Sequence, residues 1–314
     1  MKSNSAILKK ADMALAELTS NGGVLNPEQS NTFIRTALEQ PTMLQQARIV
    51  VMTGPQKEIN KIGFGSRIMK PAVEGTGLIL ADRSKPLTSK IALNTKEIIA
   101  EIRLPYSVVE DNIERGSVNF GGSNMSGGIV DTIVAMIAER AALDLEELAL
   151  LGDTASGDPY LALVDGWMKR ATSHVVDSTA AKVSRTLFKN GLLAMPNPYK
   201  RSLAALKHFV SVNQGIEYAD TLASRETALG DAKHQTPMPN YGAGVIVEGA
   251  ALMPDALGLL TLPKNLIFGI QRDISFEAEK LISERSYKIV VTARVDAQIE
   301  EEDAVVKYTN IVAP

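Results

Sequence analysis

The chain has 314 residues, 45% of them hydrophobic, which is enough apolar material for a sizeable core divided between two lobes. A formal net charge of -3 and an isoelectric point near 5.8 argue against a surface that binds nucleic acid through bulk positive charge. The lack of cysteine excludes disulfides, thiolate metal sites and cysteine nucleophiles, and is compatible with a cytoplasmic protein. The sequence carries no long uncharged apolar run and no signal-peptide pattern, so neither secretion nor a membrane span is predicted.

Two short helices are predicted near the N-terminus. The first covers residues 5–19 and ends at Gly22 and Gly23, and the second covers residues 32–40 and ends at Pro41. Neither helix can bury much apolar surface alone. They form either an ordinary packed extension or an arm that reaches a neighbouring subunit, and the sequence favours neither reading.

A short strand at 48–52 leads into a segment, residues 53–90, that is poor in large apolar side chains and rich in Gly, Pro, Lys and Arg. Strand-like pieces at 59–64, 66–73 and 77–81 predict an extended hairpin. Its excess of basic over acidic residues suits contact with an acidic surface of a neighbour, and a solubilising surface loop is the alternative. The basic residues are Lys57, Lys61, Arg67, Lys70, Arg83, Lys85 and Lys90.

The middle of the chain predicts a strand, a short helix and a long helix. Residues 96–104 alternate, with Ile98, Ala100, Ile102 and Leu104 on one face, and residues 107–115 form a short capped helix. A Gly/Ser/Asn-rich segment at 121–128 then opens into a helix at 126–151. The apolar stripe predicted for this helix consists of Ile129, Ile133, Met136, Ile137, Leu143, Leu148 and Leu151, interrupted by Arg140.

The second half begins with a turn-rich passage at 153–165, after which Trp167 is predicted to be buried. Helices are predicted at 183–195 and 213–229, and strands at 207–212, 244–247, 259–262 and 266–272. Residues 287–299 alternate between apolar and polar at most positions, which predicts a long strand with one buried face. We expect this strand to pair with residues 303–311 and with the strand at 96–104 in one antiparallel sheet, so that residues from about 170 to 270 form an inserted lobe.

No catalytic, cofactor or metal site is predicted. His174, His208 and His234 are far apart in sequence; His208 is interpreted as a structural residue of a strand, and the other two are expected to be exposed in polar loops. The motifs of zinc proteases, serine hydrolases and nucleotide-binding loops do not occur. The four consecutive acids at 300–303 would splay apart, which favours a solvated turn over a cation site.

The order of these parts resembles the major capsid proteins of tailed phages with the HK97-like fold. The resemblance rests on residues 22–27 (GGVLNP), 47–52 (ARIVVM), 102–111 (IRLPYSVVED) and 151–153 (LGD), together with the hairpin and the long helix. It implies an α+β fold with an N-terminal arm at 1–47, an extended loop with flanking strands at 48–95, and a peripheral domain at 96–169 with a spine helix at 126–151. An axial domain at 170–270 and a return to the peripheral sheet at 271–314 complete it.

The resemblance also implies a function. Such subunits form hexamers and pentamers of an icosahedral shell that encloses double-stranded DNA without sequence specificity, so the expected place is the virion capsid, assembled in the host cytoplasm. The expected partners are copies of the chain, a separate scaffold protein, because no scaffolding segment precedes the arm motif, and a portal; no membrane is expected. An encapsulin-like compartment shell and a hydrolytic enzyme using Ser66 or His174 are the alternatives. The residues expected to contact neighbouring subunits are Lys61, Arg67, Lys70, Arg83, Lys85, Leu25 and Phe33.

Overall fold

A computed structural model describes residues 42–64, 67–71, 83, 85–105, 129–223, 240–241, 244–271 and 275–313. The two predicted N-terminal helices, the helix predicted at 107–115 and the glycine-rich segment lie outside these ranges. None of the helices in the described ranges is long and apolar enough to cross a membrane.

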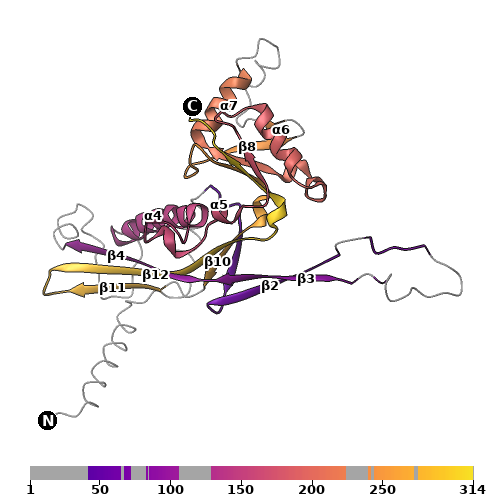
Figure 1. The fold of residues 1–314 in the computed structure, drawn as a ribbon. Coiled ribbons are helices and arrows are strands. Elements are labelled where there is room, and N and C mark those ends of the chain that lie inside the picture. The colour runs from indigo at the N-terminus through magenta and orange to yellow at the C-terminus, as the bar shows by residue number, and fades with distance from the viewer. Residues whose placement is uncertain are drawn as a thin grey trace.

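The first of two large sheets is built around one long strand, β12 (Ser286–Ile299). On β12 the predicted alternation is confirmed, because residues 289, 291, 293, 295, 297 and 299 are all buried. β12 pairs antiparallel with β4 (Lys96–Pro105), as predicted, and with β11 (Ser275–Leu281) and β10 (Leu266–Gln271); β1 (Arg48–Met52) pairs parallel to β10. Figure 1 shows β4, β12 and β11 side by side.

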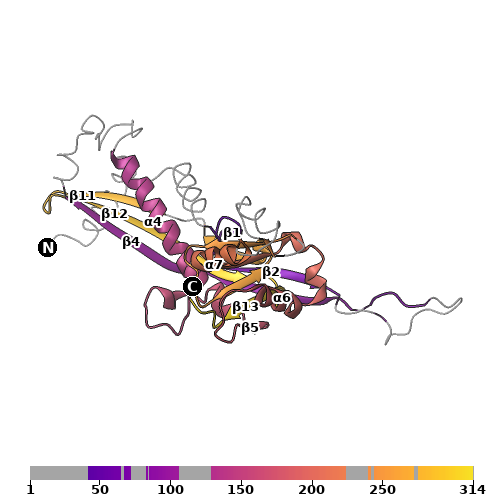
Figure 2. The ribbon, with the colours of Figure 1, turned by 90° about the horizontal axis from the view of Figure 1, so that it is seen from above.

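The long helix α4 (Ile129–Leu151) covers one face of this sheet and runs along β12 and β4 (Figure 2). The helix is confirmed, but its predicted apolar stripe is partly wrong: Met136 is 64% exposed and Leu143 is 38% exposed. The buried face instead passes through Ala138, Ala142 and Leu145 and reaches Ala149 at helical spacing. Small alanine side chains let the helix lie close to the strands, so the contact face was not marked by large residues.

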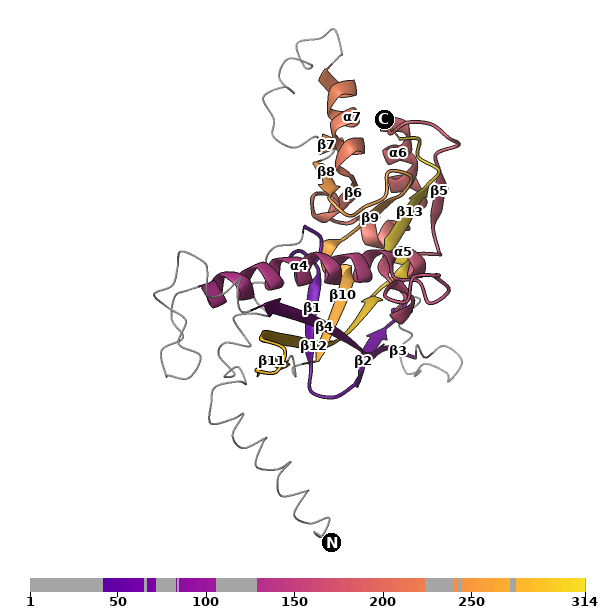
Figure 3. The ribbon, with the colours of Figure 1, turned by 90° about the vertical axis from the view of Figure 1, so that its left-hand side faces the viewer.

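The second sheet has the order β5-β13-β9-β6-β8-β7 and stands above the first (Figure 3). Its strands are β5 (Val175–Asp177), β13 (Val305–Thr309), β9 (Gly258–Thr261), β6 (Lys207–Ser211), β8 (Val245–Ala250) and β7 (Asn240–Tyr241), and it carries the helices α6 (Arg185–Ala194) and α7 (Val212–Ala223). The predicted pairing of residues 303–311 with the long strand is therefore wrong, because β13 pairs with β9 and β5. The strand predicted at 266–272 also belongs to the first sheet, as β10.

Short elements connect the two sheets. Helix α5 (Trp167–Arg170) follows the turn-rich passage, and Trp167 is fully buried, as predicted, with its Nε1 donating to the Ile267 carbonyl at 3.1 Å. The 3-10 turns are η2 (Leu161–Leu163), η3 (Asn197–Lys200), η4 (Leu203–Ala205), η5 (Pro263–Asn265) and η6 (Glu302–Ala304).

Residues 42–47 join the two sheets. Met43, Leu44 and Ala47 are buried in a core that also holds residues of α4 and of both sheets. The Met43 amide donates to Glu146 Oε1 of α4 at 3.0 Å, and burial raises the pKa of the Glu146 carboxyl while this bond opposes the rise. On the other side, Gln46 contacts Glu248 and accepts from Lys207 Nζ at 2.7 Å. The segment thus fixes the long helix to the second sheet.

Candidate functional site

A two-stranded hairpin extends away from the first sheet (Figure 1). It consists of β2 (Gln56–Gly63) and β3 (Leu87–Asn94), which pair antiparallel from Gln56 opposite Asn94 to Gly63 opposite Leu87. Both strands are mostly exposed along their length. The piece predicted at 77–81 lies outside the described residues, and the described residues of the piece predicted at 66–73, residues 67–71, are not in a strand.

The outer part of the hairpin presents large apolar side chains to solvent. A monomeric protein rarely exposes such a series on one projection, and an exposed apolar surface of this kind usually marks an interaction site. Strand edges with exposed apolar residues are also prone to pair with other chains. The exposed side chains are Ile62 (74%), Phe64 (58%), Ile68 (50%), Met69 (81%) and Leu87 (63%).

The basic residues predicted to contact neighbours occupy two places. Arg67, Lys70, Arg83 and Lys85 lie exposed on the outer part of the hairpin, next to the apolar side chains. Lys61 lies at the inner part, where its Nζ donates to the Glu300 carbonyl at 2.8 Å and pairs with the Glu301 carboxylate of the same chain. Leu25 and Phe33 lie outside the described residues. Contact of any of these residues with a neighbouring subunit stays a prediction.

The consecutive acids after β12 brace the hairpin. Glu300 pairs with Arg48 of β1 at 3.0 Å, Glu301 pairs with Lys61 of β2, and Glu302 accepts from the Thr172 and Ser173 amides at 3.2 and 3.1 Å. The hydrogen bonds from Thr172 and Ser173 lower the pKa of the Glu302 carboxyl. The predicted splaying is confirmed for Glu300, Glu301 and Glu302, which reach three different elements, but not for Asp303, which lies 3.8 Å from His174 in the segment that Glu302 also contacts.

The root of the hairpin is packed against the face of the first sheet opposite α4. Leu93 is fully buried there with Val50, Met52 and Ile267. The sheet accommodates it through Gly269, where a Cβ atom would lie 3.2 Å from Met52 Sδ and 3.5 Å from the Leu93 side chain. The hairpin is therefore anchored at one end and exposed at the other.

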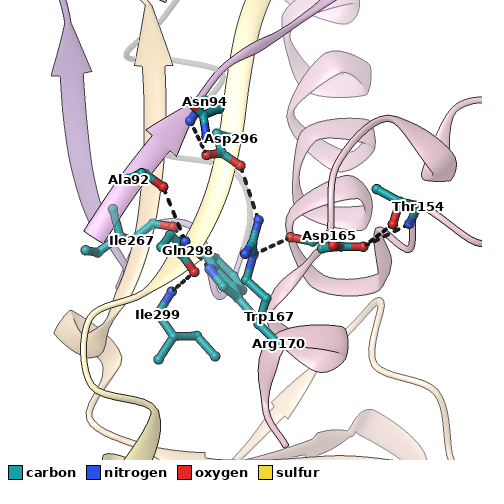
Figure 4. Close-up of polar contacts among 10 residues, drawn as sticks. All are labelled: Ala92, Asn94, Thr154, Asp165, Trp167, Arg170, Ile267, Asp296, Gln298 and Ile299. Carbon is teal, nitrogen blue, oxygen red and sulfur yellow. Dashed lines mark hydrogen bonds and ion pairs between the residues drawn. The ribbon is translucent and has the colours of Figure 1, made fainter. Parts of the chain in front are cut away.

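Polar groups fix the same root from a second direction (Figure 4). The backbone N–H of Asn94 donates to Asp296 Oδ2 at 2.7 Å. The side-chain Nε2 of Gln298 donates to the Ala92 carbonyl at 3.4 Å. Asp296 is only 3% exposed and lies 3.8 Å from the Arg170 guanidinium. Burial raises the pKa of its carboxyl, and the Asn94 bond and the Arg170 charge oppose the rise.

Arg170 links this root to the loop after the long helix. Its Nε donates to the Asp165 carbonyl at 2.9 Å, and Asp165 Oδ1 accepts from both the amide and the hydroxyl of Thr154 at 2.9 Å. Those hydrogen bonds lower the pKa of the Asp165 carboxyl. Between the hairpin root and this loop lies an open cavity of about 430 Å³, with Ala92, Lys96, Leu163 and Gln298 among its lining residues.

The sequence did not reveal this root. Leu93 lies just outside a segment with few large apolar residues, and Asp296 occupies a polar position of an alternating strand, where exposure is the ordinary expectation. Predicting the burial of Asp296 would have required knowing that the end of β3 crosses the face of the first sheet opposite α4.

Two of the three histidines, His174 and His208, lie in the described residues. His208 is fully buried in β6, as its structural reading predicted, with Nδ1 2.9 Å from the Tyr308 hydroxyl, and burial lowers its pKa to about 3. His174 is wrongly predicted as exposed, because its side chain is only 25% exposed and lies 3.8 Å from Asp303. His234 and Ser66 lie outside the described residues. Within the described part of the chain, no group of three or more His, Cys, Asp or Glu side chains could hold a metal ion.

Comparison with known proteins identifies the family. No protein-family profile matches the chain. A protein of Bacillus subtilis (strain 168), named "Putative prophage capsid protein YqbE", is 41% identical over 320 residues, which cover 98% of this chain and 99% of the relative.

Solved structures show the same fold at low sequence identity. A chain of the satellite phage P4 procapsid, which includes the size determination (Sid) protein, superposes with a TM-score of 0.67 at 16% identity, covering 99% of this chain and 98% of that one. A chain of the capsid of a native GTA particle gives a TM-score of 0.62 at 14% identity, covering 88% and 91%. The fold is thus the mixed α+β fold of phage capsid subunits, and with the full-length sequence match it follows that the chain belongs to the family of phage capsid proteins.

Proposed function

We propose that this chain is a major capsid subunit whose copies form hexamers and pentamers of a closed icosahedral shell around double-stranded DNA. The observation that carries the proposal is the hairpin: it is braced at its root and ends in exposed apolar and basic side chains. Stable subunit interfaces commonly bury about 2,000 Å² or more. A projecting hairpin gains such area without a larger core.

In this proposal the first sheet with α4 is the peripheral domain, the second sheet with α6 and α7 is the axial domain, and the hairpin is the extended loop. The boundaries differ from those expected from the sequence at two places, since β10 belongs to the first sheet and β13 to the second. The shell contacts DNA without sequence specificity, since a chain with a net charge of -3 offers no bulk positive charge for tight binding. A separate scaffold protein and a portal are the further partners, the subunit is not an enzyme, and its place is the virion capsid after assembly in the host cytoplasm.

The outward face of α4 is the surface that suits the hairpin of a neighbouring copy. Met136 and Leu143 are exposed there, and Glu139 and Glu147 lie at helical spacing on the same face. Arg140 also lies on this face but is paired with Asp144, so the two glutamates are its carboxylates that could meet the basic residues of the hairpin, Arg67, Lys70, Arg83 and Lys85. The hairpin of one subunit therefore lies on the long helix of the next.

The test of shell formation is electron microscopy of the purified protein and of a deletion that removes residues 60–88. The intact chain forms large uniform particles that contain DNA when they are isolated from a producing cell, whereas the deletion variant stays a folded, soluble monomer. Closed particles from the deletion variant would contradict the proposal that the hairpin holds neighbouring subunits together. Particles filled with protein cargo instead of DNA would favour the compartment alternative.

The receiving face is tested by charge exchange. Lys85→Glu with Arg67→Glu weakens assembly, and Glu139→Lys with Glu147→Lys weakens it equally, because each pair of changes places like charges opposite one another. The chain that carries all four changes recovers assembly. If the four changes together are no better than either pair, the hairpin docks elsewhere.

A further inference from the structure

Two side chains of β12 attach the outer edge of β3, and they do so at matched spacing. Asp296 accepts from the Asn94 amide, and Gln298 donates to the Ala92 carbonyl. Backbone groups two residues apart on a strand point to the same edge, and side chains two residues apart on a strand point to the same face. The end of β3 thus lies across the face of β12 and is held at two consecutive points (Figure 4).

We propose that Asp296 and Gln298 are positioning residues that set the direction in which the hairpin leaves the subunit. A segment held at one point can pivot, whereas a segment held at two points has a fixed direction. The inference rests on the proposed function, in which the hairpin must reach a particular place on the next copy.

Each of the two side chains is itself held in place. The Oε1 atom of Gln298 accepts from the Ile299 amide at 3.2 Å, which turns the Nε2 donor toward Ala92. Asp296 is held between the Asn94 amide and the Arg170 guanidinium, and Arg170 is in turn bonded to the Asp165 carbonyl. The direction of the hairpin is therefore fixed relative to both the long strand β12 and the loop after α4.

Packing leaves the direction of the hairpin to polar contacts, which are these two bonds and, further along β2, the contacts of Lys61 with Glu300 and Glu301. The cavity between the hairpin root and the loop at 152–166 lies on the side of Ala92 and Asn94, so side-chain packing does not fill the space on that side. Leu93 holds the root against the sheet from the opposite face, as a single buried side chain of β3. Apolar burial is non-directional, so Leu93 fixes the place of the root, and the two polar attachments fix its angle.

A buried carboxylate is an expensive way to gain stability, because desolvation offsets most of what the ion pair contributes. An apolar residue at position 296 would bury the same surface at no such cost. It would leave the Asn94 amide without its acceptor and the corner between β3 and β4 without a directional bond. The choice of Asp at this position fits a role in geometry.

The experiment measures the direction of the hairpin in unassembled protein. The natural chain has no cysteine, so Thr88→Cys on β3 and Glu139→Cys on α4 introduce the only two sites for spin labels. The distance between the labels has a narrow distribution in the parent chain. Gln298→Leu and Asp296→Ala broaden it, and Lys90→Ala, which removes only the exposed ion pair with Glu58 on the same hairpin, leaves it unchanged.

A second readout separates positioning from general loosening. The Asn94 amide exchanges its hydrogen about tenfold faster in Asp296→Ala, the effect expected from losing one hydrogen bond to a charged acceptor. Asp296→Asn retains an oxygen for the Asn94 amide and keeps its protection. If Asp296→Ala does not fold, Gln298→Leu still decides the question through the label distances, with Asp296→Asn as the control that keeps the Asn94 bond.

In assembled material, Gln298→Leu gives shells with a wider spread of diameters than the parent chain. Unbroadened label distances in folded Gln298→Leu and Asp296→Ala overturn the inference, and so does equal broadening in Lys90→Ala. If the parent chain forms no particles, the proposed function fails, while the label distances and the Asn94 exchange still test the role of Asp296 and Gln298.

Discussion

The sharpest prediction concerns two apolar residues of the outer hairpin, Ile62 and Leu87, changed together to serine. They are 74% and 63% exposed in the single subunit, so the substitution removes little that stabilises its fold. Full burial of such a side chain contributes about 1.5–3 kcal/mol, so at these exposures the pair contributes about 2–4 kcal/mol to each contact with a neighbour. This corresponds to an increase of about 30- to 700-fold in the concentration needed for assembly.

Light scattering and sedimentation velocity over a range of protein concentrations measure this shift. The control is the chain with Ile62→Val and Leu87→Ile, which keeps apolar side chains at both positions and assembles close to the parent concentration. The midpoint of urea unfolding of the serine variant, measured below its assembly concentration, stays near that of the parent, because exposed substitutions usually change stability by less than about 0.5 kcal/mol. An unchanged assembly concentration for a folded serine variant refutes the argument that these side chains become buried between subunits.

Three further predictions concern the single subunit. Leu93→Ala lowers the free energy of unfolding by about 2–5 kcal/mol, the usual cost of truncating a fully buried leucine, and urea denaturation measures it. Glu146→Ala lowers it by about 1–3 kcal/mol because the buried Met43 amide loses its acceptor. Glu146→Gln keeps an acceptor for the Met43 amide. The pKa of Glu146 is raised in the folded state, so the folded chain holds the proton more tightly and loses stability as pH rises above the ordinary pKa of 4.5. Glu146→Gln removes this loss. His208 has the opposite sign: its pKa falls from 6.5 to about 3 on folding, so the unfolded chain binds the proton more readily and stability falls as pH drops below 6.5. His208→Asn, which retains an acceptor for Tyr308, removes that fall. The measurement is the urea midpoint of the variant at pH 7 and at pH 4.5. A midpoint that falls between these pH values as much as in the parent chain would contradict this account.

The sequence was most informative where one residue pattern matched one structural period. The alternation from residue 287 to residue 299 identified β12 and its buried face, because a strand with one side on a core has a period of two. The antiparallel pairing of this strand with β4 was also correct. Trp167 was correctly expected to be buried after the turn-rich passage, and His208 was interpreted from its apolar strand as a structural residue.

The sequence was less informative where the outcome depends on which elements meet. The buried face of α4 runs through alanines, and a search for large apolar residues assigned Met136 and Leu143 to it instead. β13 has an apolar pattern that either sheet could accept, and its true partners β9 and β5 follow from the path of the chain after η6. Strand pairing is a tertiary property, so a local pattern leaves it open.

The candidate site was found in outline only. The composition of residues 53–90 predicted a projecting, basic hairpin and several of its exposed cations. The contacts of Leu93, Asp296 and Gln298 that hold its root were not predicted. The Asp296 and Gln298 contacts join residues more than 170 positions apart, and Leu93 lies at the edge of a segment poor in apolar residues. Long-range contacts of single polar side chains leave no periodic trace in a sequence.

The strand order of the two sheets limits how early each sheet can form while the chain is being synthesised. β4 must wait for β12 to be synthesised before it can pair, and β5 must wait for β13, which ends at Thr309. Pairings between such distant segments form slowly because long loops must close first. Until β12 has been synthesised, the first sheet lacks its central strand and the root of the hairpin lacks Asp296 and Gln298; the second sheet is complete only after β13.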